Sequence, residues 1–379
     1  MNAKIFLSEL FPKTVNYRLA RRGLLKPTTP ITLTFSVTAA CQSLCKTCQI
    51  GDLYRCHPER AKEDLTLEEI EQLFSRMGHI YFFNISGGEP FLRKDLPQII
   101  KLACRYLKPG IVHIPTNALL PKRIEELTIE ILKIMHELAP HAPLTVKPSI
   151  DGVGEKHDEI RGVTGNFTKL EETISRLKHI RQDYPTLHVE LGTVVSNFNI
   201  DSLTEIEDYV HGLGIESYRN EIAEQREEFF NVGEPITPTG EQYQELMRVF
   251  KQKIRENLTL KRRLARITES FRLEYYDLVS KIMIEKTQVI PCYGGISNVH
   301  LNFNGELWPC CVLGYAKPLG NVRQADYDFY RVFHSQQAQD VRMHIREKKC
   351  WCPLANQAYS NILCHLPSLV RVGRNIVMG

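Results

Sequence analysis

Three cysteines stand close together near the start of the chain: Cys41, Cys45 and Cys48. Thiolates are soft ligands, and three of them on one short loop can hold three corners of a 4Fe-4S cluster and leave the fourth iron open. Cysteines at such spacings also bind zinc, and Cys56 or His57 could complete a zinc site. From the triplet alone, the iron–sulfur cluster and the zinc ion both remain open.

A second motif, Gly87-Gly88-Glu89-Pro90, follows about forty residues later. The two glycines let backbone approach a ligand, and the carboxylate can accept hydrogen bonds from an amine. Alone, this tetrapeptide would be no more than a turn between a strand and a helix.

The elements that must position these motifs alternate between short β-like runs and longer helical patterns, which is typical of βαβ units around a parallel sheet. The predicted strands are 31–37, 79–85, 111–115, 144–150, 187–195 and 215–219. The predicted helices are 66–77, 95–107, 122–138, 166–182 and 200–212, with Thr66 and Glu69 at capping-box spacing and Asn166 placed to cap. The order predicts an α/β fold with a partial, TIM-like (βα)6 barrel, and the cysteine triplet lies where its first strand ends.

Composition divides the chain into four segments. We expect a basic helical extension at 1–30, the barrel at 31–221, a helical connecting region at 222–290 and a small cysteine-rich domain at 291–379. The basic stretch 251–266 in the connecting region is interpreted as solvated helix faces. In the last segment, Asn304-Gly305 between apolar runs predicts a β-hairpin.

Charge and hydropathy restrict partners and compartment. The net charge is +4, and residues 1–30 hold six basic side chains against one acidic one, so the rest of the chain is close to neutral. Nucleic-acid binding is therefore not expected. Neither a signal peptide nor a membrane span is predicted, which favours a cytoplasmic protein with reduced thiols. Peripheral membrane contact through the basic N-terminus stays open, although packing of that segment is preferred.

Together, the cysteine triplet and Gly-Gly-Glu-Pro, in this order and spacing, resemble the radical S-adenosylmethionine (SAM) superfamily over about residues 31–220. The resemblance implies that the open iron chelates SAM. It further implies that the reduced 4Fe-4S cluster cleaves SAM to a 5′-deoxyadenosyl radical, which takes a hydrogen atom from substrate. A reductant such as flavodoxin or ferredoxin would supply the electron.

The same resemblance implies a SAM site, with Gly88 and Glu89 at the methionine amino group and Arg161 at its carboxylate. The implied cofactor residues are Gly87, Gly88, Glu89, Pro90, Thr116, Asn117, Ser149, Asp151, Arg161 and Val195. Asp151 also fits a simple turn, and Arg161 could form an ion pair with Asp158 or Glu155. Thr47 stands where the family often has an aromatic residue, a departure that bears on the usual adenine contact and not on the cluster.

The later cysteines, spaced around Gly305, resemble the auxiliary-cluster domains called SPASM and twitch. A full SPASM domain has seven cysteines for two clusters, whereas this region has six, so one auxiliary 4Fe-4S cluster is expected and a second is not. The expected ligands are Cys292, Cys310, Cys350 and Cys352, with Cys364 as the main alternate and Cys311 less favoured. A zinc ribbon is the structural alternative. Cys56 and Cys104 are expected to be buried small hydrophobes.

Net oxidation, with the auxiliary cluster accepting an electron, is the default reaction. The alternative is redox-neutral epimerisation or C–C bond formation, for which Tyr293, Tyr218 or Cys311 could return a hydrogen atom. Small-molecule, lipid and peptide substrates all stay open, with the peptide weakened because only 40 residues precede Cys41. A non-catalytic iron–sulfur or zinc protein is the rival class, but it has no use for Gly-Gly-Glu-Pro.

Overall fold

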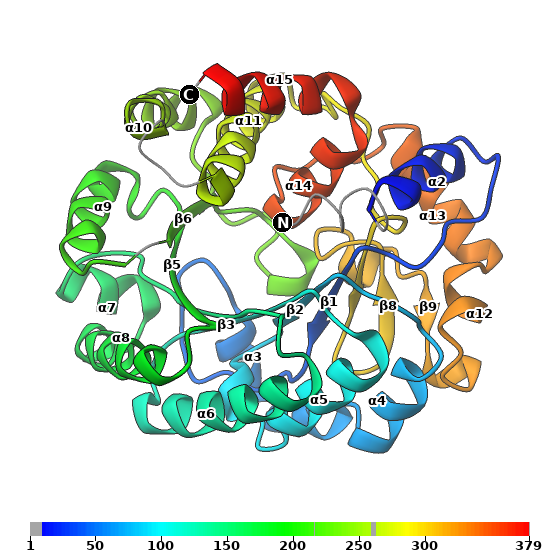
Figure 1. Ribbon diagram of the computed structural model, residues 1–379, viewed down its shortest axis with the longest axis horizontal. Coiled ribbons are helices and arrows are strands. Elements are labelled where there is room, and N and C mark those ends of the chain that lie inside the picture. The colour runs from blue at the N-terminus through cyan, green and yellow to red at the C-terminus, as the bar shows by residue number, and fades with distance from the viewer. Residues whose placement is uncertain (1–9, 216, 259–262, 379) are drawn as a thin grey trace.

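The protein is described by a computed structural model that covers residues 10–215, 217–258 and 263–378. Within these residues a nine-stranded sheet runs in the order β6-β5-β4-β3-β2-β1-β7-β8-β9 (Figure 1). The first six strands are parallel: β1 (Thr32–Ser36), β2 (Phe82–Ser86), β3 (Ile111–Thr116), β4 (Leu144–Pro148), β5 (Leu187–Val195) and β6 (Ser217–Ile222). The predicted open α/β barrel is confirmed.

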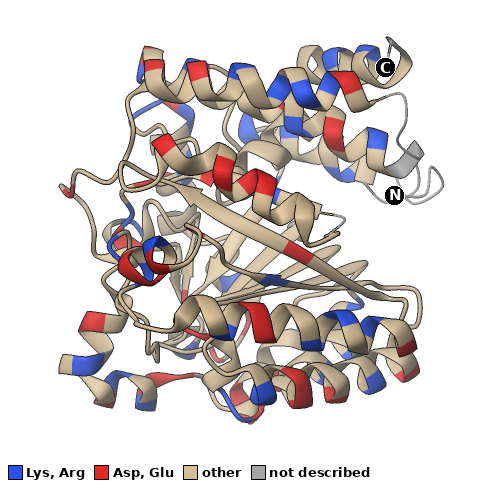
Figure 2. Ribbon diagram, turned by 90° about the vertical axis from the view of Figure 1, so that its left-hand side faces the viewer, with Lys and Arg blue, Asp and Glu red and all other residues tan. Residues whose placement is uncertain are grey.

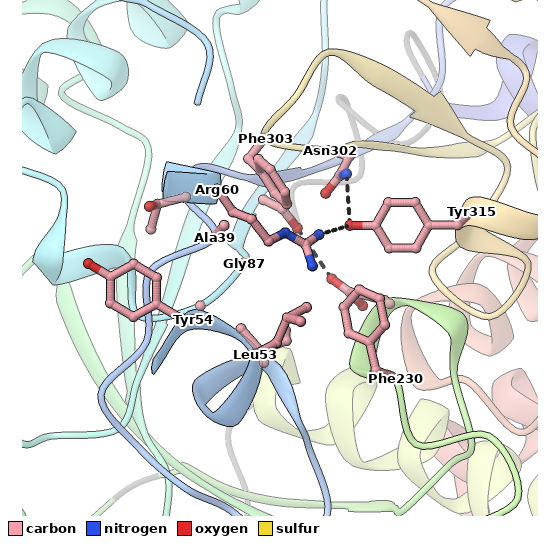
Figure 3. Close-up of a pocket in the computed structure, with 14 residues that line it drawn as sticks. Ala39, Leu53, Tyr54, Arg60, Gly87, Phe230, Asn302, Phe303 and Tyr315 are labelled. Atoms are coloured by element: carbon pink, nitrogen blue, oxygen red, sulfur yellow. Dashed lines mark hydrogen bonds between the residues drawn. The ribbon is translucent and has the colours of Figure 1, made fainter. Parts of the chain in front are cut away.

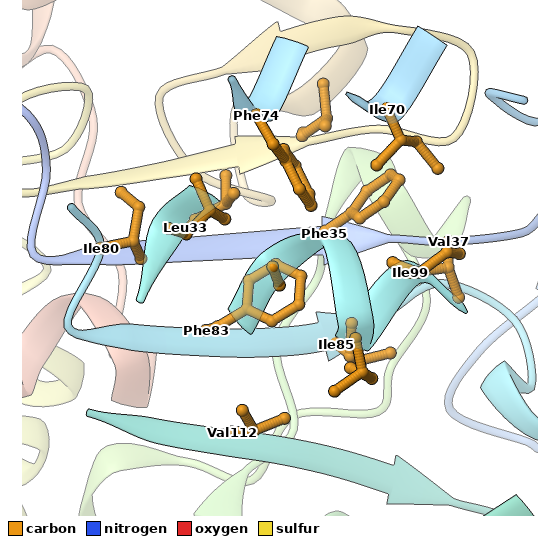
Figure 4. Packing of buried hydrophobic residues seen from close by; sticks show 14 of the residues in the cluster. Leu33, Phe35, Val37, Ile70, Phe74, Ile80, Phe83, Ile85, Ile99 and Val112 are labelled. Atoms are coloured by element: carbon orange, nitrogen blue, oxygen red, sulfur yellow. The ribbon is translucent and has the colours of Figure 1, made fainter. Parts of the chain in front are cut away.

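Helices cover the outer face of the parallel strands. They are α4 (Leu67–Phe74), α5 (Leu96–Leu102), α6 (Pro121–Leu138), α8 (Asn166–Asp183) and α9 (Leu203–Gly212). Alternate side chains of each strand pack into this layer, as Figure 4 shows for Phe35 and Phe83 against Phe74 of α4. Because strand side chains alternate, the intervening residues face the barrel interior, where chemistry can take place.

Of the two predicted helix caps, one is confirmed and the other is wrong. Thr66 and Glu69 form the predicted capping box at α4. The N-cap of α8 is Gly165, so the prediction that Asn166 caps this helix is wrong. Asp158 instead accepts hydrogen bonds from the first backbone N–H groups of α8, and Asn166 donates to the carbonyl of Asn117 at 3.0 Å.

Two short helices were not predicted, α3 (Ile50–Cys56) and α7 (Glu155–Arg161). Each has seven residues, which is too short to show an apolar period. Both border the cysteine triplet, α3 in sequence and α7 through backbone hydrogen bonds.

The cysteine-rich region extends the barrel sheet. Its first strand β7 (Asn298–Leu301) pairs in parallel with β1, and β8 (Glu306–Trp308) and β9 (Gly320–Asn321) continue antiparallel. The predicted hairpin is confirmed: Asn302 N–H donates to the carbonyl of Glu306 at 2.8 Å, and Gly305 turns the chain with φ of +85°. A single sheet therefore connects the barrel to the auxiliary region.

The remaining helices pack around this sheet. On the β6 side lie α10 (Gly240–Leu258), α11 (Arg263–Glu285), α14 (Ala355–Cys364) and α15 (Leu366–Met378); on the hairpin side lie α2 (Phe11–Arg21), α12 (Phe329–Phe333) and α13 (Gln336–Arg346) (Figure 1). Figure 2 shows acidic and basic residues mixed along the outer helices. Residues 1–9 of the predicted basic extension, and 259–262 of the predicted basic stretch, lie outside the described residues. Among the helices described, none combines the length and apolar character that a bilayer span requires.

Candidate active site

The cysteine triplet lies on a loop after β1 that hydrogen bonds from neighbouring segments hold in place. The N–H groups of Leu44 and Lys46 donate to the carbonyls of Arg161 and Ile160 in α7, at 3.1 and 2.9 Å. On the other side, Asn231 Nδ2 donates to the carbonyl of Thr47 at 2.7 Å. The loop geometry is thus fixed by the surrounding fold.

The spacing of the sulfur atoms bears on the choice between zinc and a cluster. In the part of the chain that the structure describes, no three cysteine sulfurs lie within 4.8 Å of one another. A tetrahedral zinc ion with Zn–S bonds of about 2.3 Å needs sulfurs only about 3.8 Å apart. In the described residues, neither the triplet nor the later cysteines therefore gather three sulfurs at the spacing of a single zinc ion.

Burial makes the thiols of the triplet poor acids by themselves. It raises the pKa of Cys41 to about 12, and it raises the pKa of Cys48 well above its ordinary value. Burial also raises the pKa of Cys45, although the Arg161 guanidinium opposes this shift. Thiolates at this loop are consequently favoured only together with a cation that neutralises them.

The Gly-Gly-Glu-Pro loop at the end of β2 packs directly on the cysteine loop. Gly88 N–H donates to the carbonyl of Thr38 at 2.9 Å, and Glu89 N–H donates to that of Ala40 at 2.8 Å. A Cβ on Gly88 would lie 2.0 Å from the Ala40 carbonyl oxygen, so only glycine fits there. Pro90 begins a buried 3-10 turn. The glycines thus allow two loops to approach each other, a role that the sequence did not reveal.

Glu89 is buried and its carboxylate is oriented by three hydrogen bonds. Thr116 Oγ1 and Phe91 N–H donate to Oε1 at 2.9 and 3.1 Å, and Asn117 N–H donates to Oε2 at 2.7 Å. Burial raises the pKa of Glu89 to about 7, against these hydrogen bonds, which lower it. The structure therefore brings Thr116 and Asn117 to Glu89, and Oε2, which accepts a single hydrogen bond, keeps acceptor capacity for a bound ammonium group.

Arg161 forms a buried ion pair with Asp151 at 3.0 Å, and not with Asp158 or Glu155. The other carboxylate oxygen of Asp151 accepts from Val194 N–H at 2.8 Å. The predicted residues Asp151 and Arg161 thus meet, and together they tie the end of β4 to β5 and to α7.

Ser149 and Val195 lie at the ends of β4 and β5, as predicted. Ser149 N–H donates to the carbonyl of Thr116 at 3.0 Å. Val195 is fully buried and packs between the sheet and the helices with Ile150 and Leu191. The side chain of Val195 therefore belongs to the core, and the assignment of this residue to the cofactor site stays a prediction.

Several buried polar atoms around the cysteine loop have no hydrogen-bond partner in the described structure. They are the amide atoms of Gln42, the hydroxyl of Ser43, Nδ2 of Asn117 and Nε of Arg161. Unpaired buried donors and acceptors are costly, and their concentration at one place indicates a polar ligand. The residues present therefore fit SAM bound beside a cluster on the triplet.

Four of the later cysteines line one pocket, namely Cys292, Cys310, Cys350 and Cys352. Cys364 does not: it packs under α2, and its carbonyl accepts from Arg18 Nε at 2.8 Å. The alternate assignment of Cys364 as a ligand is thus wrong on geometric grounds. Cys104 is buried as expected, but Cys56 is exposed, contrary to expectation.

The pocket of the four cysteines is supported by polar residues that sequence reasoning missed. Gln288 Nε2 donates to the carbonyls of Cys350 and Ile345, both at 2.8 Å. Gly294 N–H lies 3.4 Å from Cys292 Sγ, as a donor to that sulfur. Isolated polar residues in loops give no periodic signal, so only the structure reveals them.

A loop after β6, residues 224–231, contacts the triplet loop and was also missed. Besides the Asn231 contact with Thr47, the carbonyl of Phe229 accepts from Gln49 N–H at 2.9 Å. On its other side, the turn Glu227–Phe229 packs against Gly314–Ala316, a few residues after Cys310 and Cys311. The loop therefore lies between the triplet loop and the chain that follows Cys310 and Cys311.

Of the three candidate hydrogen donors, only Cys311 lies between the two sites. It is buried with Glu228 and His300, and their ligand atoms all lie within 4.8 Å of one another. Ser36 at the end of β1 bonds to both partners, at 2.7 Å to His300 Nε2 and 3.2 Å to Glu228 Oε1. Cys311 thus belongs to a buried polar network beside the cysteine loop.

The two tyrosine candidates pack in other parts of the structure, and their assignment as hydrogen donors stays a prediction. Tyr218 packs on the helix side of β6, where its hydroxyl donates to Thr193 at 2.9 Å. Tyr293 packs against α2 with Tyr17 and Leu10. In both cases the aromatic side chain packs in a hydrophobic core.

The interior of the barrel carries charge. Arg219 of β6 pairs with Glu190 of β5 at 3.1 Å, and Lys147 of β4 lies 3.5 Å from Glu221. Arg219 Nε and Glu190 Oε1 are buried without a partner in the described structure. The interior therefore has donors and acceptors available for a polar substrate.

A pocket beside Gly87 presents a further cation (Figure 3). The Arg60 guanidinium donates to the Tyr315 hydroxyl at 3.2 Å and lies 5.2 and 5.6 Å from the ring centres of Phe230 and Phe303. Figure 3 shows the guanidinium pointing between these aromatic side chains. They fix a positive charge at the edge of the site, a feature that the sequence did not indicate.

Comparison with known proteins agrees with this geometry. The model of the radical SAM superfamily matches residues 35–210, and the model of the SPASM iron–sulfur cluster-binding domain matches residues 292–353. The antilisterial bacteriocin subtilosin biosynthesis protein AlbA of Bacillus subtilis is 25% identical over 339 residues, 85% of this chain and 65% of the relative. GTP 3′,8-cyclase of Rhodopseudomonas palustris is 27% identical over 191 residues, 48% of this chain and 50% of the relative. The chain thus spans less than two thirds of either relative.

Solved structures share the fold. SuiB of Streptococcus suis, bound to S-adenosylmethionine, has a TM-score of 0.58 at 13% identity, covering 86% of this chain and 70% of that one. The anSMEcpe structure with bound AdoMet and Cp18Cys peptide has a TM-score of 0.56 at 16% identity, covering 92% and 97%. The chain thus contains a radical SAM domain at residues 35–210 and a SPASM iron–sulfur cluster-binding domain at residues 292–353.

Proposed function

We propose that this enzyme oxidises a peptide substrate by radical chemistry. A 4Fe-4S cluster with SAM supplies, when bound, a 5′-deoxyadenosyl radical that removes a hydrogen atom from the substrate. The observation that carries the proposal is the presence of two separate cysteine sets, with residues 224–231 packed against the triplet loop and against the chain that follows Cys310. Such an arrangement suits the passage of an electron from the substrate to the second set, which net oxidation requires.

The residues around the triplet hold and orient the cofactor in this proposal. Cys41, Cys45 and Cys48 hold the cluster, and Glu89, oriented by Thr116 and Asn117, accepts the ammonium group of SAM. The unpaired Nε of Arg161 would donate a hydrogen bond to the carboxylate group of SAM. Because these groups are buried and fixed in place, they need little reorganisation when SAM binds.

The second set holds one auxiliary 4Fe-4S cluster on Cys292, Cys310, Cys350 and Cys352. Gln288 fixes the backbone of Cys350, and Gly294 N–H donates to the Cys292 sulfur. Such hydrogen bonds to a thiolate or its backbone tune the potential of a cluster. A flavodoxin or ferredoxin in a reducing cytoplasm would reduce the first cluster.

A peptide substrate is supported by similar proteins, which include a subtilosin biosynthesis protein and solved complexes with the Cp18Cys peptide and with the precursor peptide SuiA. The ion-paired interior of the barrel and the Arg60 cation suit a polar, hydrogen-bonded chain. Small polar molecules are the competing class, because GTP 3′,8-cyclases also match.

The test is formation of 5′-deoxyadenosine by the anaerobically reconstituted, reduced enzyme with SAM, followed by liquid chromatography and mass spectrometry. Wild-type enzyme and a Cys104→Ala control, altered at a buried cysteine outside both sets, should both form it. A wild-type enzyme with a fully loaded first cluster that forms none contradicts the proposal. With a candidate peptide, a product that has lost a pair of hydrogen atoms indicates oxidation.

A redox-neutral outcome is the second candidate, favoured by the position of Cys311 beside Glu228 and His300. In that reaction the Cys311 thiol gives its hydrogen atom to the substrate radical and becomes a thiyl radical. An electron from the flavodoxin or ferredoxin and a proton from solvent then restore the thiol. The two reactions differ in heavy water, where only the second places deuterium at the reacting carbon. A Cys311→Ala variant would lose that deuterium incorporation while still forming 5′-deoxyadenosine.

A further inference from the structure

A groove of about 420 Å³ lies on the hairpin side of the molecule, away from the barrel mouth. One wall is the chain from the end of α2 to Pro27, and the other is α13. From α13, Gln336, Gln339, Met343 and Arg346 line the groove, a spacing that places them along one stripe of the helix. None of the residues assigned to the cofactor or to the clusters lines it.

The charge of the groove is positive throughout. Arg21, Lys26, Arg342 and Arg346 line it, and no aspartate or glutamate does so. Lys26 and Arg346 are exposed, and no acidic partner for either occurs among the described residues. Arg342 is held in place by donating to the carbonyls of Gly295 and Phe333, at 2.7 and 2.6 Å. The groove thus combines fixed cations with free ones, and its field favours an anion.

Apolar side chains lie between these charges. Leu24 is 65% exposed, Leu25 is 51% exposed and Met343 is 44% exposed. Large apolar residues grouped at a concave surface indicate that another molecule covers them, because water contact with them is unfavourable. A free small anion would leave these side chains uncovered.

We propose that this groove binds an acidic, amphipathic peptide segment, with carboxylates at Lys26 and Arg346 and apolar side chains on Leu24, Leu25 and Met343. The stripe from Gln336 to Arg346 is about 15 Å long at 1.5 Å per residue. It accommodates about four extended residues at about 3.3 Å each. A concave groove with cations on both walls encloses a chain on two sides, whereas a flat bilayer would reach only its rims.

The segment would belong to the peptide substrate, and in this respect the inference rests on the proposed function. The position of the groove suits that role. Arg21, on its wall, donates from Nε to the carbonyl of Cys292 at 2.9 Å, so a docked segment lies beside the four-cysteine pocket. Anchoring one part of the substrate here raises the effective concentration of the rest at the barrel.

Fluorescence anisotropy with a fluorescein-labelled peptide of alternating glutamate and leucine tests the proposal on the reconstituted full-length enzyme. Wild type should bind it, with affinity falling as salt rises. A Lys26→Glu, Arg346→Glu variant should bind about tenfold or more weakly, because two attractive charges become repulsive. A Leu24→Ser, Leu25→Ser variant should also bind more weakly.

The matched control reverses two exposed lysines on the other side of the molecule, Lys94→Glu and Lys101→Glu, and should bind as wild type does. If both charge-reversal variants lost the same affinity for the peptide, the loss would come from net charge alone, and the proposal would be overturned. The proposal would also be overturned if the wild-type enzyme did not bind the peptide but sedimented with phosphatidylglycerol vesicles. Formation of 5′-deoxyadenosine without peptide should be unchanged in every variant, so failure of the groove and failure of the proposed function are read separately.

Discussion

The first cysteine site occupies one loop, from Cys41 to Cys48, whereas the second collects its cysteines from Cys292 to Cys352. The first is held from outside: backbone groups of α7, the Gly87-Gly88 loop and Asn231 all bond to it. The second is held by side chains such as Gln288 that fasten distant segments to each other. A site contained in one loop depends on its neighbours for shape, and a site drawn from many segments depends on the fold that brings them together.

The largest effect that would test this comparison is removal of one cysteine from each site. Cys45→Ala should abolish 5′-deoxyadenosine formation and remove about half of the iron, because the remaining two thiolates cannot hold the first cluster. Cys310→Ala should lose a similar share of iron but still cleave SAM. Iron and sulfide analysis with product quantification checks both. Loss of all iron in either variant would show that the two sites do not load independently.

Gly88→Ala should damage the first site without touching its ligands. The added Cβ would lie 2.0 Å from the Ala40 carbonyl oxygen, so the cysteine loop must move. We expect loss of most SAM cleavage, with the auxiliary cluster still present in electron paramagnetic resonance spectra. Gly373→Ala, where nothing described lies within 4 Å of the new Cβ, is the control. Normal SAM cleavage by Gly88→Ala would mean that the loop tolerates displacement.

Asp151→Asn should destabilise the barrel by about 3 kcal/mol, because Arg161 would be left as a buried charge without its partner. The asparagine oxygen can still accept from Val194 N–H, so the effect isolates the charge. Urea unfolding followed by circular dichroism measures it. Asp158→Asn, which weakens the N-terminus of α8, should cost less, about 1 kcal/mol. If Asp158→Asn destabilised the protein more than Asp151→Asn, the ion pair of Arg161 with Asp151 would not be the more important contact.

The smallest effect concerns the attachment of the auxiliary region to the barrel. Glu69 of α4 accepts two hydrogen bonds from Arg323, at 2.7 and 2.8 Å, and these lower the pKa of Glu69 to about 2. Since the pKa is lower in the folded state than its ordinary 4.5, the stabilisation is present above about pH 4.5 and is lost as the pH falls toward 2.

Glu69→Gln should therefore lower the free energy of unfolding at neutral pH by about 1 kcal/mol, and the difference from wild type should vanish in acid. Chemical unfolding at several pH values measures this difference. The double variant Glu69→Gln, Arg323→Gln should have a free energy of unfolding little lower than that of either single variant. Full additivity would show that the pair does not interact.

The sequence was sufficient to predict those elements that depend on a few neighbouring residues. The six parallel strands, the Thr66 capping box and the Asn304-Gly305 hairpin depend on periodicity or on turn chemistry over a few residues. The cysteine triplet and Gly-Gly-Glu-Pro are defined by residue types and spacing, so the resemblance to the family could also be identified from the sequence.

The sequence could not show which way an individual side chain faces. Val195, Tyr218 and Tyr293 lie at or beside predicted functional positions, but each packs into a core layer. Cys364 is separated from the other cysteines because α14 carries it under α2. The loop 224–231 has no local pattern, and its role comes only from its contacts with the triplet loop and with the chain that follows Cys310.

The pairing of β7 with β1 also has a consequence for how the chain folds. Strand β1 leads into the cysteine loop, yet one of its edges is covered by residues 298–301, which are synthesised some 260 residues later. While the ribosome makes the intervening chain, β1 presents an open edge that can pair with other chains. The loop that begins the radical chemistry is thus attached to a strand completed near the end of synthesis, so correct assembly of the first site depends on emergence of the last part of the protein.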